Sequence, residues 1–427
     1  MRNLRGARER RRARTVTGVS FGACVMVSLL LLLIRPSPAA ADLVTDWNLT
    51  TLAAQVPTNT RTLAMVHLAM FDAVNAVSPE YQAYAVSGPT AGDVSPEAAA
   101  AGAAYGVLIR LLPTQQALLD AALVASLAPI PDGPAKTAGL ALGDAVADAI
   151  VVLRSGDGIL APGPAYTPGT EPGDYQLTPP NFPAPVATGA GLWTPFAMTS
   201  PSQFRPNGPP ALHTGRYARE LEEVRALGTA DPLLRIAEQD LIANWHREQG
   251  QFQLNRIARE AVASGTFDLV TSARLFALLS VATMDAVQSV FEAKYVYNFW
   301  RPITAIRDAD ADGNRATDPD PTWAPFLGVT PPHPEYPAAH AVVHAAGVTV
   351  LEAFLGHHYS FDATSDTAPG VRSFDSLAAL LEDAKLGRIY GGIHFRSALD
   401  EGARQGKKLG KWVLKTLLEP LHGGGSP

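Results

Sequence analysis

Apolar positions recur every three or four residues along most of this chain, which is the spacing of one face of an α-helix. We find no convincing run of alternating apolar and polar residues of the kind that indicates strands. The pattern therefore predicts an all-α protein built from packed helical bundles. The expected helices cover residues 52–77, 96–112, 115–128, 135–153, 217–227, 232–246, 252–264, 267–297, a segment starting near Pro337, 374–389 and 395–418.

A long segment rich in glycine and proline, residues 155–210, interrupts these helices. It keeps large apolar side chains, including Trp193, Phe196 and Phe204, so we expect an ordered loop that wraps the helices. The pattern divides the chain into an N-terminal helical part with this loop (residues 42–215) and a C-terminal helical part (residues 216–427).

The first 41 residues read as a signal peptide. A basic stretch precedes an apolar run and three alanines, Ala39 to Ala41, that suit cleavage before Asp42. The apolar run could also span a bilayer as an uncleaved anchor, which is the alternative. Cleavage predicts a secreted protein, and it removes Cys24, the only cysteine, so thiol catalysis and cysteine-bound zinc are excluded.

The charge of the remaining chain is acidic. Residues 1–41 carry eight arginines and one glutamate, so their net +7 taken from the total of −6 leaves about −13. Such a surface does not favour nucleic acid or anionic lipid. We therefore expect no nucleic-acid partner and no stable membrane association after cleavage.

Three segments place unusual polar residues within apolar surroundings. Lys294 and Arg301 are seven residues apart at the end of a long helix, so they can point the same way. Arg388 ends another helix, and His394 follows after a pair of glycines that lets another group approach. Each segment alone is equally consistent with surface cations or a helix cap.

The third segment, PPHPEYPAAHAVVHAAG, holds His333, His340 and His344. His340 should lie near a helix N-terminus, where free N–H groups can bind an anion, and His344 one turn later. The spacing of His340 and His344 could also bind zinc, but no glutamate or third ligand stands nearby, so packing is the better interpretation for His344. Together the three segments supply cations and histidines suited to a tetrahedral oxyanion.

These three motifs resemble the signature of the vanadium-dependent haloperoxidase and type-2 phosphatidic acid phosphatase superfamily. The segments HLAMFDAVNAV and TSPSQFRPNGPPAL also resemble secreted bacterial haloperoxidase-like members. The matching residues are Lys294, Arg301-Pro302, Pro337-Ala338-Ala339-His340, and Gly387-Arg388 with His394.

The resemblance implies a role for each residue. Lys294, Arg301, Arg388 and the amide of Ala339 would bind the oxygens of vanadate or phosphate. His394 would ligate vanadium, or become phosphorylated in a phosphatase. His340 would be the acid–base catalyst, and His333, at a position that is histidine in bromoperoxidases, would tune halide choice.

The chain departs from the superfamily pattern at several positions. Ala338 and Ala339 replace a serine and a glycine, and Gly387 replaces the serine before the arginine. Ala398 stands where a carboxylate usually orients the ligand histidine, and the nearest acids in sequence are Asp400 and Glu401.

The resemblance implies vanadate-dependent oxidation of bromide or iodide by hydrogen peroxide, with a small organic acceptor. The alternatives are an acid phosphatase that works through a phosphohistidine and a non-catalytic oxyanion-binding protein. The segment Asp308–Asn314 resembles the start of a calcium loop, but Pro319 stands where the final glutamate would be, so a solvated acidic loop is the better interpretation.

Overall fold

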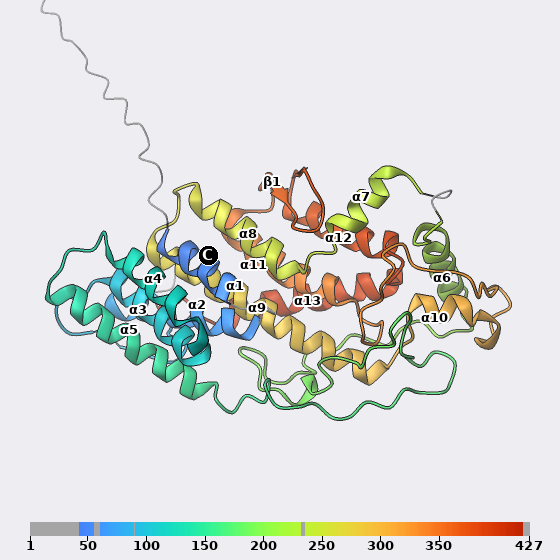
Figure 1. The fold of residues 1–427 in the computed structure, drawn as a ribbon, viewed down its shortest axis with the longest axis horizontal. Helices are drawn as coiled ribbons and strands as arrows, with labels where there is room; N and C mark the ends of the chain where they lie inside the picture. Colours follow the sequence, from blue (N-terminus) through green and yellow to red (C-terminus); the bar gives the residue numbers. More distant parts are fainter. Residues whose placement is uncertain (1–41, 55–59, 89, 232–234, 422–427) are drawn as a thin grey trace, which may run out of the picture. The chain divides into compact units, whose positions relative to one another are not determined.

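We describe residues 42–54, 60–88, 90–231 and 235–421 of a computed structural model. Within this part of the chain, helices dominate and the one sheet is a short hairpin, which confirms the predicted all-α class (Figure 1). The expected signal peptide lies outside the described residues. The elements are α1 Leu43–Ala54, α2 Thr60–Val77, α3 Pro96–Leu111, α4 Gln116–Leu127, α5 Pro134–Leu153, α6 Gly215–Leu227, α7 Ala237–Trp245, α8 Gly250–Ala263, α9 Leu269–Tyr297, α10 Pro302–Arg307, α11 Ala339–Leu355, β1 Phe361–Thr364, β2 Val371–Phe374, α12 Leu377–Tyr390 and α13 Arg396–Thr416.

Some boundaries differ from those expected, for local reasons. The region predicted as one helix over residues 52–77 contains two, and α1 starts earlier because the Asp42 carboxylate accepts the N–H groups of Val44 and Thr45. The hairpin β1–β2 was not predicted, and it takes Phe374 out of the following helix. Short helix α10 was also missed, although Pro302 suits a first helical position.

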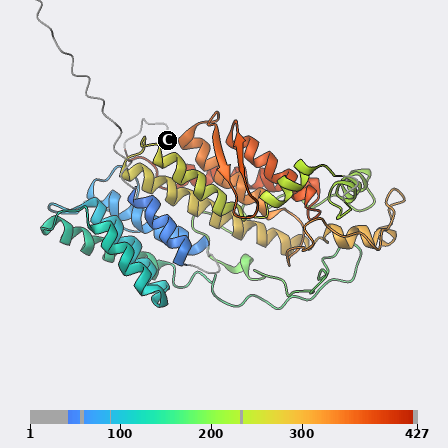
Figure 2. The same ribbon diagram turned by 45° about the horizontal axis from the view of Figure 1, so that its top comes forward.

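Ala39–Pro427 form one compact unit, and helix α9 is its central helix. It packs against α2 on one side and against α11 and α13 on the other, so the N-terminal and C-terminal helical parts share one core (Figure 2). Among the described residues, it is the one continuous helix that is long and apolar enough to cross a membrane. However, 89% of its most apolar 18-residue stretch is buried inside the protein, as in a core helix. Asp268 caps its first turn by accepting the N–H of Thr271.

Helices α11 and α13 pack closely because small residues line their contact. Gly402, Gly406 and Gly410 follow one another at four-residue spacing on α13. A Cβ atom at Gly402 or Gly410 would lie 2.9 or 2.7 Å from a backbone oxygen of the α11 side. Only glycine therefore allows this separation of the two helices.

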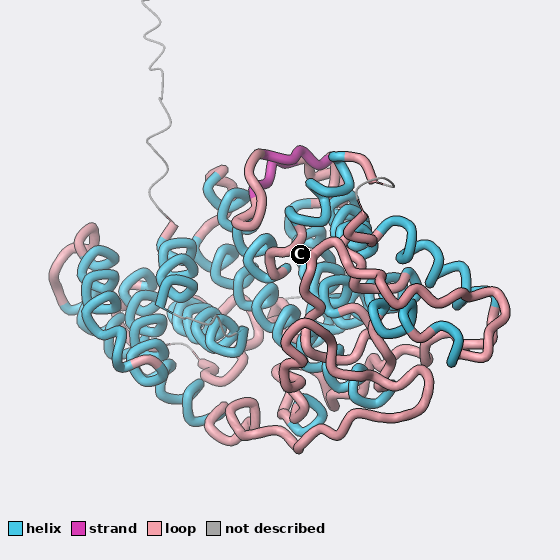
Figure 3. The backbone as a smooth tube through the Cα atoms, turned by 45° about the vertical axis from the view of Figure 1, so that its right-hand side comes forward, coloured by secondary structure: helices cyan, strands magenta, loops and turns pink. Residues whose placement is uncertain are grey.

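The segment rich in glycine and proline, residues 155–210, is mostly loop lying against the helices, as expected (Figure 3). A buried carboxylate on α9 binds residues 196–198 of this loop, near its C-terminal end. Asp285 is fully buried and accepts the backbone N–H groups of Phe196, Ala197 and Met198 at 2.8, 2.8 and 2.9 Å. This contact ties the loop to the central helix.

We expect Asp285→Ala to lower the free energy of unfolding by about 3 kcal/mol, because three buried N–H groups would lose a charged acceptor. Urea unfolding followed by circular dichroism measures the change. The matched control is Asp93→Ala, at an exposed aspartate with no hydrogen bond to another described residue, which should alter stability by less than about 0.5 kcal/mol. Equal effects of the two substitutions would contradict this assignment.

Candidate functional site

The predicted site residues surround one cavity of about 470 Å³. His333, Ala339, His340, Arg388 and His394 line it directly. Lys294 and Arg301 are fully buried just behind its wall. The chain brings these residues together from the end of α9, the loop before α11, the start of α11, and the α12–α13 turn. The remaining wall is formed by Thr60, Val186, Arg247, Gln249, Gly250, Gln251, Val287, Phe291, Pro331, Pro332 and Val343.

Arg301 connects two of the site histidines. Its Nη1 donates to the carbonyl of Ile393 at 2.9 Å and lies 3.3 Å from His394 Nε2. Its Nη2 lies 2.8 Å from His333 Nδ1. Since a guanidinium can only donate, His394 Nε2 acts as an acceptor. His333 Nδ1 lies between this donor and the carbonyl oxygen of Pro334, at 3.1 Å, so either tautomer of His333 finds a partner.

Lys294 and Arg388 complete the cationic set. Lys294 Nζ donates to the carbonyls of Pro334 and Glu335 at 2.8 and 2.9 Å. Arg388 Nη1 donates to the carbonyl of His246 at 2.7 Å, while its buried Nε has no partner among the described residues. Burial lowers the pKa of Lys294 well below its usual value, and the neighbouring arginines add to this.

A buried carboxylate orients His394. Glu335 is fully buried, and its Oε1 accepts from His394 Nδ1 at 2.8 Å and from the N–H of Phe395 at 2.9 Å. The carboxylate therefore does not come from the position of Ala398 but from the loop before α11, 59 residues earlier in the chain. Asp400, one of the nearest acids in sequence, pairs with Lys385 instead.

This contact fixes the tautomer of His394. With Nδ1–H donating to Glu335, Nε2 carries the lone pair, which faces Arg301 Nη1 at 3.3 Å and which a ligand would take in place of this long contact. Burial lowers the pKa of His394 well below its usual value, so the ring is neutral. Burial also raises the pKa of Glu335 to about 7, although Lys294 and Arg301 act in the opposite direction.

His340 is held by the wall between α7 and α8. Its Nε2 lies 3.1 Å from the carbonyl oxygen of Glu248, which can only accept, so Nε2 carries the proton and Nδ1 is the basic nitrogen. Burial is the main reason that the pKa of His340 lies well below its usual value, and the charge of Arg388 lowers it further. The ring is therefore a neutral base.

His344 has a structural environment. Its Nδ1 donates to the carbonyl of His340 at 2.8 Å, and its Nε2 lies 3.0 Å from the amide of Gln253. Gly250 packs directly against the ring, with its ideal Cβ position only 2.6 Å away. The zinc alternative gains no support, because no group of three or more potential ligand side chains is found in the described residues.

The departures from the superfamily motif have local explanations. A side chain at Gly387 would meet His246, whose Cβ lies 2.9 Å from the ideal Cβ position, so serine does not fit there. Ala338 is the N-cap of α11 and offers no side-chain cap. The N–H groups of Ala339, His340 and Ala341 find no acceptor among the described residues, so the helix N-terminus remains able to bind an anion.

The donor set fits a multiply charged oxyanion. Lys294, Arg301 and Arg388 are buried together. The carboxylate of Glu335 acts on Lys294 and Arg301 through its charge, but its hydrogen bonds go to His394 and Phe395. Buried charges need partners, so an anion among these side chains would remove an unfavourable excess of positive charge. Vanadate and phosphate both meet this requirement.

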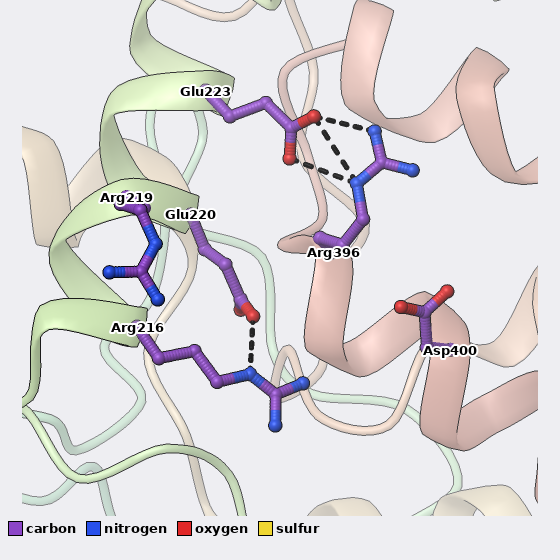
Figure 4. A pocket seen from close by; sticks show the side chains of 6 residues that line it. All are labelled: Arg216, Arg219, Glu220, Glu223, Arg396 and Asp400. Carbon is purple, nitrogen blue, oxygen red and sulfur yellow. Dashed lines mark hydrogen bonds and ion pairs between the residues drawn. The ribbon is translucent and has the colours of Figure 1, made fainter.

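A second pocket, of about 520 Å³, differs in character (Figure 4). Its six charged side chains include Arg216 paired with Glu220 and Arg396 paired with Glu223. Positive and negative charges are equal in number there, so the pocket has no excess charge to attract an ion. We interpret this pocket as a surface contact at which charged side chains of α6 and α13 form ion pairs.

The acidic loop Asp308–Asn314 forms internal contacts. Asp312 accepts from the hydroxyl of Thr317 at 2.8 Å and from the N–H of Asn314 at 2.6 Å. These bonds, and the absence of a cluster of potential metal ligands in the described residues, give the calcium alternative no support.

Comparisons with known proteins relate the chain to vanadium haloperoxidases. Residues 274–423 match the model of the VCPO second helical-bundle domain. The chain is 28% identical over 184 residues to a vanadium chloroperoxidase from Curvularia inaequalis, a match that covers 32% of this chain and 30% of that protein. Both matches are consistent with the vanadium haloperoxidase and acid phosphatase superfamily, to which the three motifs point.

Solved structures of superfamily members extend the likeness to nearly the whole chain. A bacterial vanadium-dependent iodoperoxidase matches with a TM-score of 0.75 and 26% identity, over 90% of this chain and 97% of that one. The apo form of a bacterial vanadium-dependent chloroperoxidase shares the fold, with a TM-score of 0.66 and 16% identity over 90% of this chain and 94% of that one. The matched region spans less than a third of the curated fungal relative's length.

Two residues of the site were missed by sequence reasoning. Glu335 is the only charged residue within the segment PPHPEYPAAH, and an acid in such an apolar, proline-rich context could have indicated a buried partner. Arg247 lines the cavity from the short turn between α7 and α8. No pattern around it distinguishes it from a surface arginine.

We expect His344→Gln to change how stability depends on pH. Burial, followed by the charge of His246, lowers the pKa of His344 to about 3 in the folded state, against about 6.5 when unfolded. The unfolded chain therefore binds the extra proton, and this residue should cost about 1.4 kcal/mol of stability per pH unit as pH falls from 6.5 towards 3.

Urea unfolding of both proteins at several pH values measures this difference. The glutamine variant should be less stable than the wild type at neutral pH, and its stability should fall less steeply with acidification. Parallel pH profiles for the two proteins would refute a buried neutral His344.

Proposed function

We propose that this protein is a vanadium-dependent haloperoxidase that oxidises bromide or iodide with hydrogen peroxide. The observation that carries the proposal is His394, whose Nδ1 is held by Glu335 so that the lone pair of Nε2 is left beside buried cations. The likeness to a bacterial iodoperoxidase at 26% identity supports the same reaction class. The phosphatase and the non-catalytic alternative are not favoured, since the similar proteins named above are haloperoxidases.

In this proposal the chain binds vanadate through four kinds of contact. Lys294, Arg301 and Arg388 donate to its oxygens, and the free N–H of Ala339 adds the helix N-terminus. His394 Nε2 ligates the metal. Bound vanadate supplies Lewis-acid activation of peroxide without changing its oxidation state.

His340 and His333 act on the other reactants. His340 Nδ1 takes a proton from hydrogen peroxide, because its Nε2–H is committed to the carbonyl of Glu248 and its low pKa keeps the ring neutral. His333 lines the cavity with a neutral ring, because burial lowers its pKa well below the usual value. A neutral ring on the cavity wall suits a large, weakly hydrated halide, and this is our reason for choosing bromide or iodide.

The expected location follows from the N-terminal sequence alone. We propose that residues 1–41 direct export and are then removed, so that the enzyme acts outside the cell. Hydrogen peroxide, halide and a small organic acceptor would be its partners.

We expect purified protein loaded with orthovanadate to oxidise iodide and bromide when peroxide is added, with little chloride oxidation and at most weak phosphomonoester hydrolysis. Triiodide absorbance and bromination of a phenol dye measure the halide reactions. His340→Ala should reduce turnover by about 10²–10⁴-fold and still bind vanadate, because it removes the base but no anion contact. Efficient phosphoester hydrolysis without vanadate, together with no halide oxidation after loading, would favour the phosphatase instead.

We expect Glu335→Gln to weaken vanadate binding by about 10–100-fold, because the amide no longer fixes the charge and tautomer of His394. Titration calorimetry with orthovanadate measures the affinity directly, and urea unfolding checks that the variant folds. Glu352→Gln, at the far end of α11, is the matched control and should bind vanadate as the wild type does. Unchanged affinity in Glu335→Gln would show that His394 needs no carboxylate.

A further inference from the structure

The cavity is larger than its inorganic reactants require. Its volume of about 470 Å³ falls within the usual range of small-molecule sites, which is roughly 300–1,000 Å³. Vanadate, peroxide and a halide each contain only a few atoms. Space therefore remains for an organic molecule beside them.

One side of this space is apolar. Val287 and Phe291 lie one helical turn apart on α9, and Val343 faces the cavity from α11. The ring of Phe291 also makes an edge contact with His333, with ring centroids 5.0 Å apart. This apolar wall therefore reaches the proposed halide position, so an aromatic ring packed on it would lie beside the newly formed oxidised halogen.

The lining of the same cavity also includes a cation, Arg247, that has no side-chain partner among the described residues. Arg247 is exposed, lines the cavity, and makes no side-chain hydrogen bond or ion pair with any described residue. Its charge reaches the site, since it helps to lower the pKa of Arg388. No aspartate or glutamate is among the described residues that line the cavity, so an anionic ligand meets no repulsion there.

We propose that the cavity binds a small aromatic acceptor that carries a carboxylate, with its ring on the wall of Val287, Phe291 and Val343 and its carboxylate on Arg247. This inference rests on the proposed haloperoxidase function and names the class of organic substrate. Arg247 is then a specificity-determining residue for the acceptor. It contributes nothing to oxidation of the halide itself.

The chemistry of the transfer step balances with the proposed reaction. The haloperoxidase step supplies hypohalous acid, which is the oxidant. A ring carbon next to a phenolic hydroxyl attacks the halogen, a carbon–halogen bond forms, and the halogen–oxygen bond breaks. The displaced ring proton joins the departing hydroxide as water.

Two probes with the same ring separate the contributions of charge and apolar contact. These are 4-hydroxybenzoate, whose carboxylate is ionised at about pH 6, and its neutral methyl ester. Calorimetry with the vanadate-loaded enzyme, without peroxide or halide, measures binding of each. We expect the carboxylate to bind about tenfold more tightly than the ester, from a charge-assisted contact.

Variants at Arg247 test the assignment. Arg247→Gln should remove this preference, Arg247→Lys should retain most of it, and both should leave affinity for the ester unchanged. Val287→Ser should weaken both probes by a similar factor. With 4-hydroxybenzoate as acceptor, Arg247→Gln should raise KM by about tenfold and leave kcat unchanged.

Three outcomes would overturn the proposal. The first is equal binding of acid and ester by the wild type, and the second is an unchanged preference in Arg247→Gln. The third is weaker vanadate binding in Arg247→Gln, which would place this arginine among the vanadate contacts instead. Iodide oxidation without any acceptor tests the underlying haloperoxidase function separately, since binding of the probes does not depend on it.

Discussion

The close contact between α11 and α13 is the constraint on which the site depends. Helix α11 begins one residue before His340, and α13 begins two residues after His394. Glycines at four-residue spacing let the backbones approach until a Cβ atom at Gly402 would lie only 2.9 Å from the carbonyl oxygen of Ala338. The close contact of the glycine positions of α13 with the backbone of α11 therefore sets the distance between His340, the proposed base, and His394, the proposed ligand.

Burial of the cations lowers the stability of the folded protein and makes the site selective for an anion. Three cationic side chains are removed from water with one buried carboxylate, Glu335, near them, which lowers the stability of the protein when no anion is present. The same excess charge favours a multiply charged oxyanion over water. Glu335 compensates part of this charge and also orients His394, so stabilisation and ligation depend on the same side chain.

Carboxylates hold the irregular segments that close the cavity. Asp285 fixes the end of the long loop through three backbone N–H groups. Glu248 binds Arg256 through its side chain and accepts from His340 through its carbonyl, so it joins the wall between α7 and α8 to the proposed base. Loops anchored in this way can form a defined cavity wall without regular secondary structure.

The sequence by itself determined the helical class, most helix positions and the set of polar residues that gather around one cavity. Helical periodicity reports which face of each segment is buried. The expectation that Lys294 and Arg301 share the long helix was wrong, because α9 ends at Tyr297 and Arg301 precedes the short helix α10. The sequence also indicated the role of His344 as a packing residue.

Only the tertiary structure decided which partners those residues meet. Glu335 reaches His394 across 59 residues, and Arg247 joins the cavity from a turn with no motif of its own. The hairpin β1–β2 and the split between α1 and α2 were likewise settled by contacts distant in sequence or by a local cap. Periodicity and spacing describe one element at a time, whereas these contacts arise from the packing of separate elements around a shared core, and their geometry cannot be derived from local patterns.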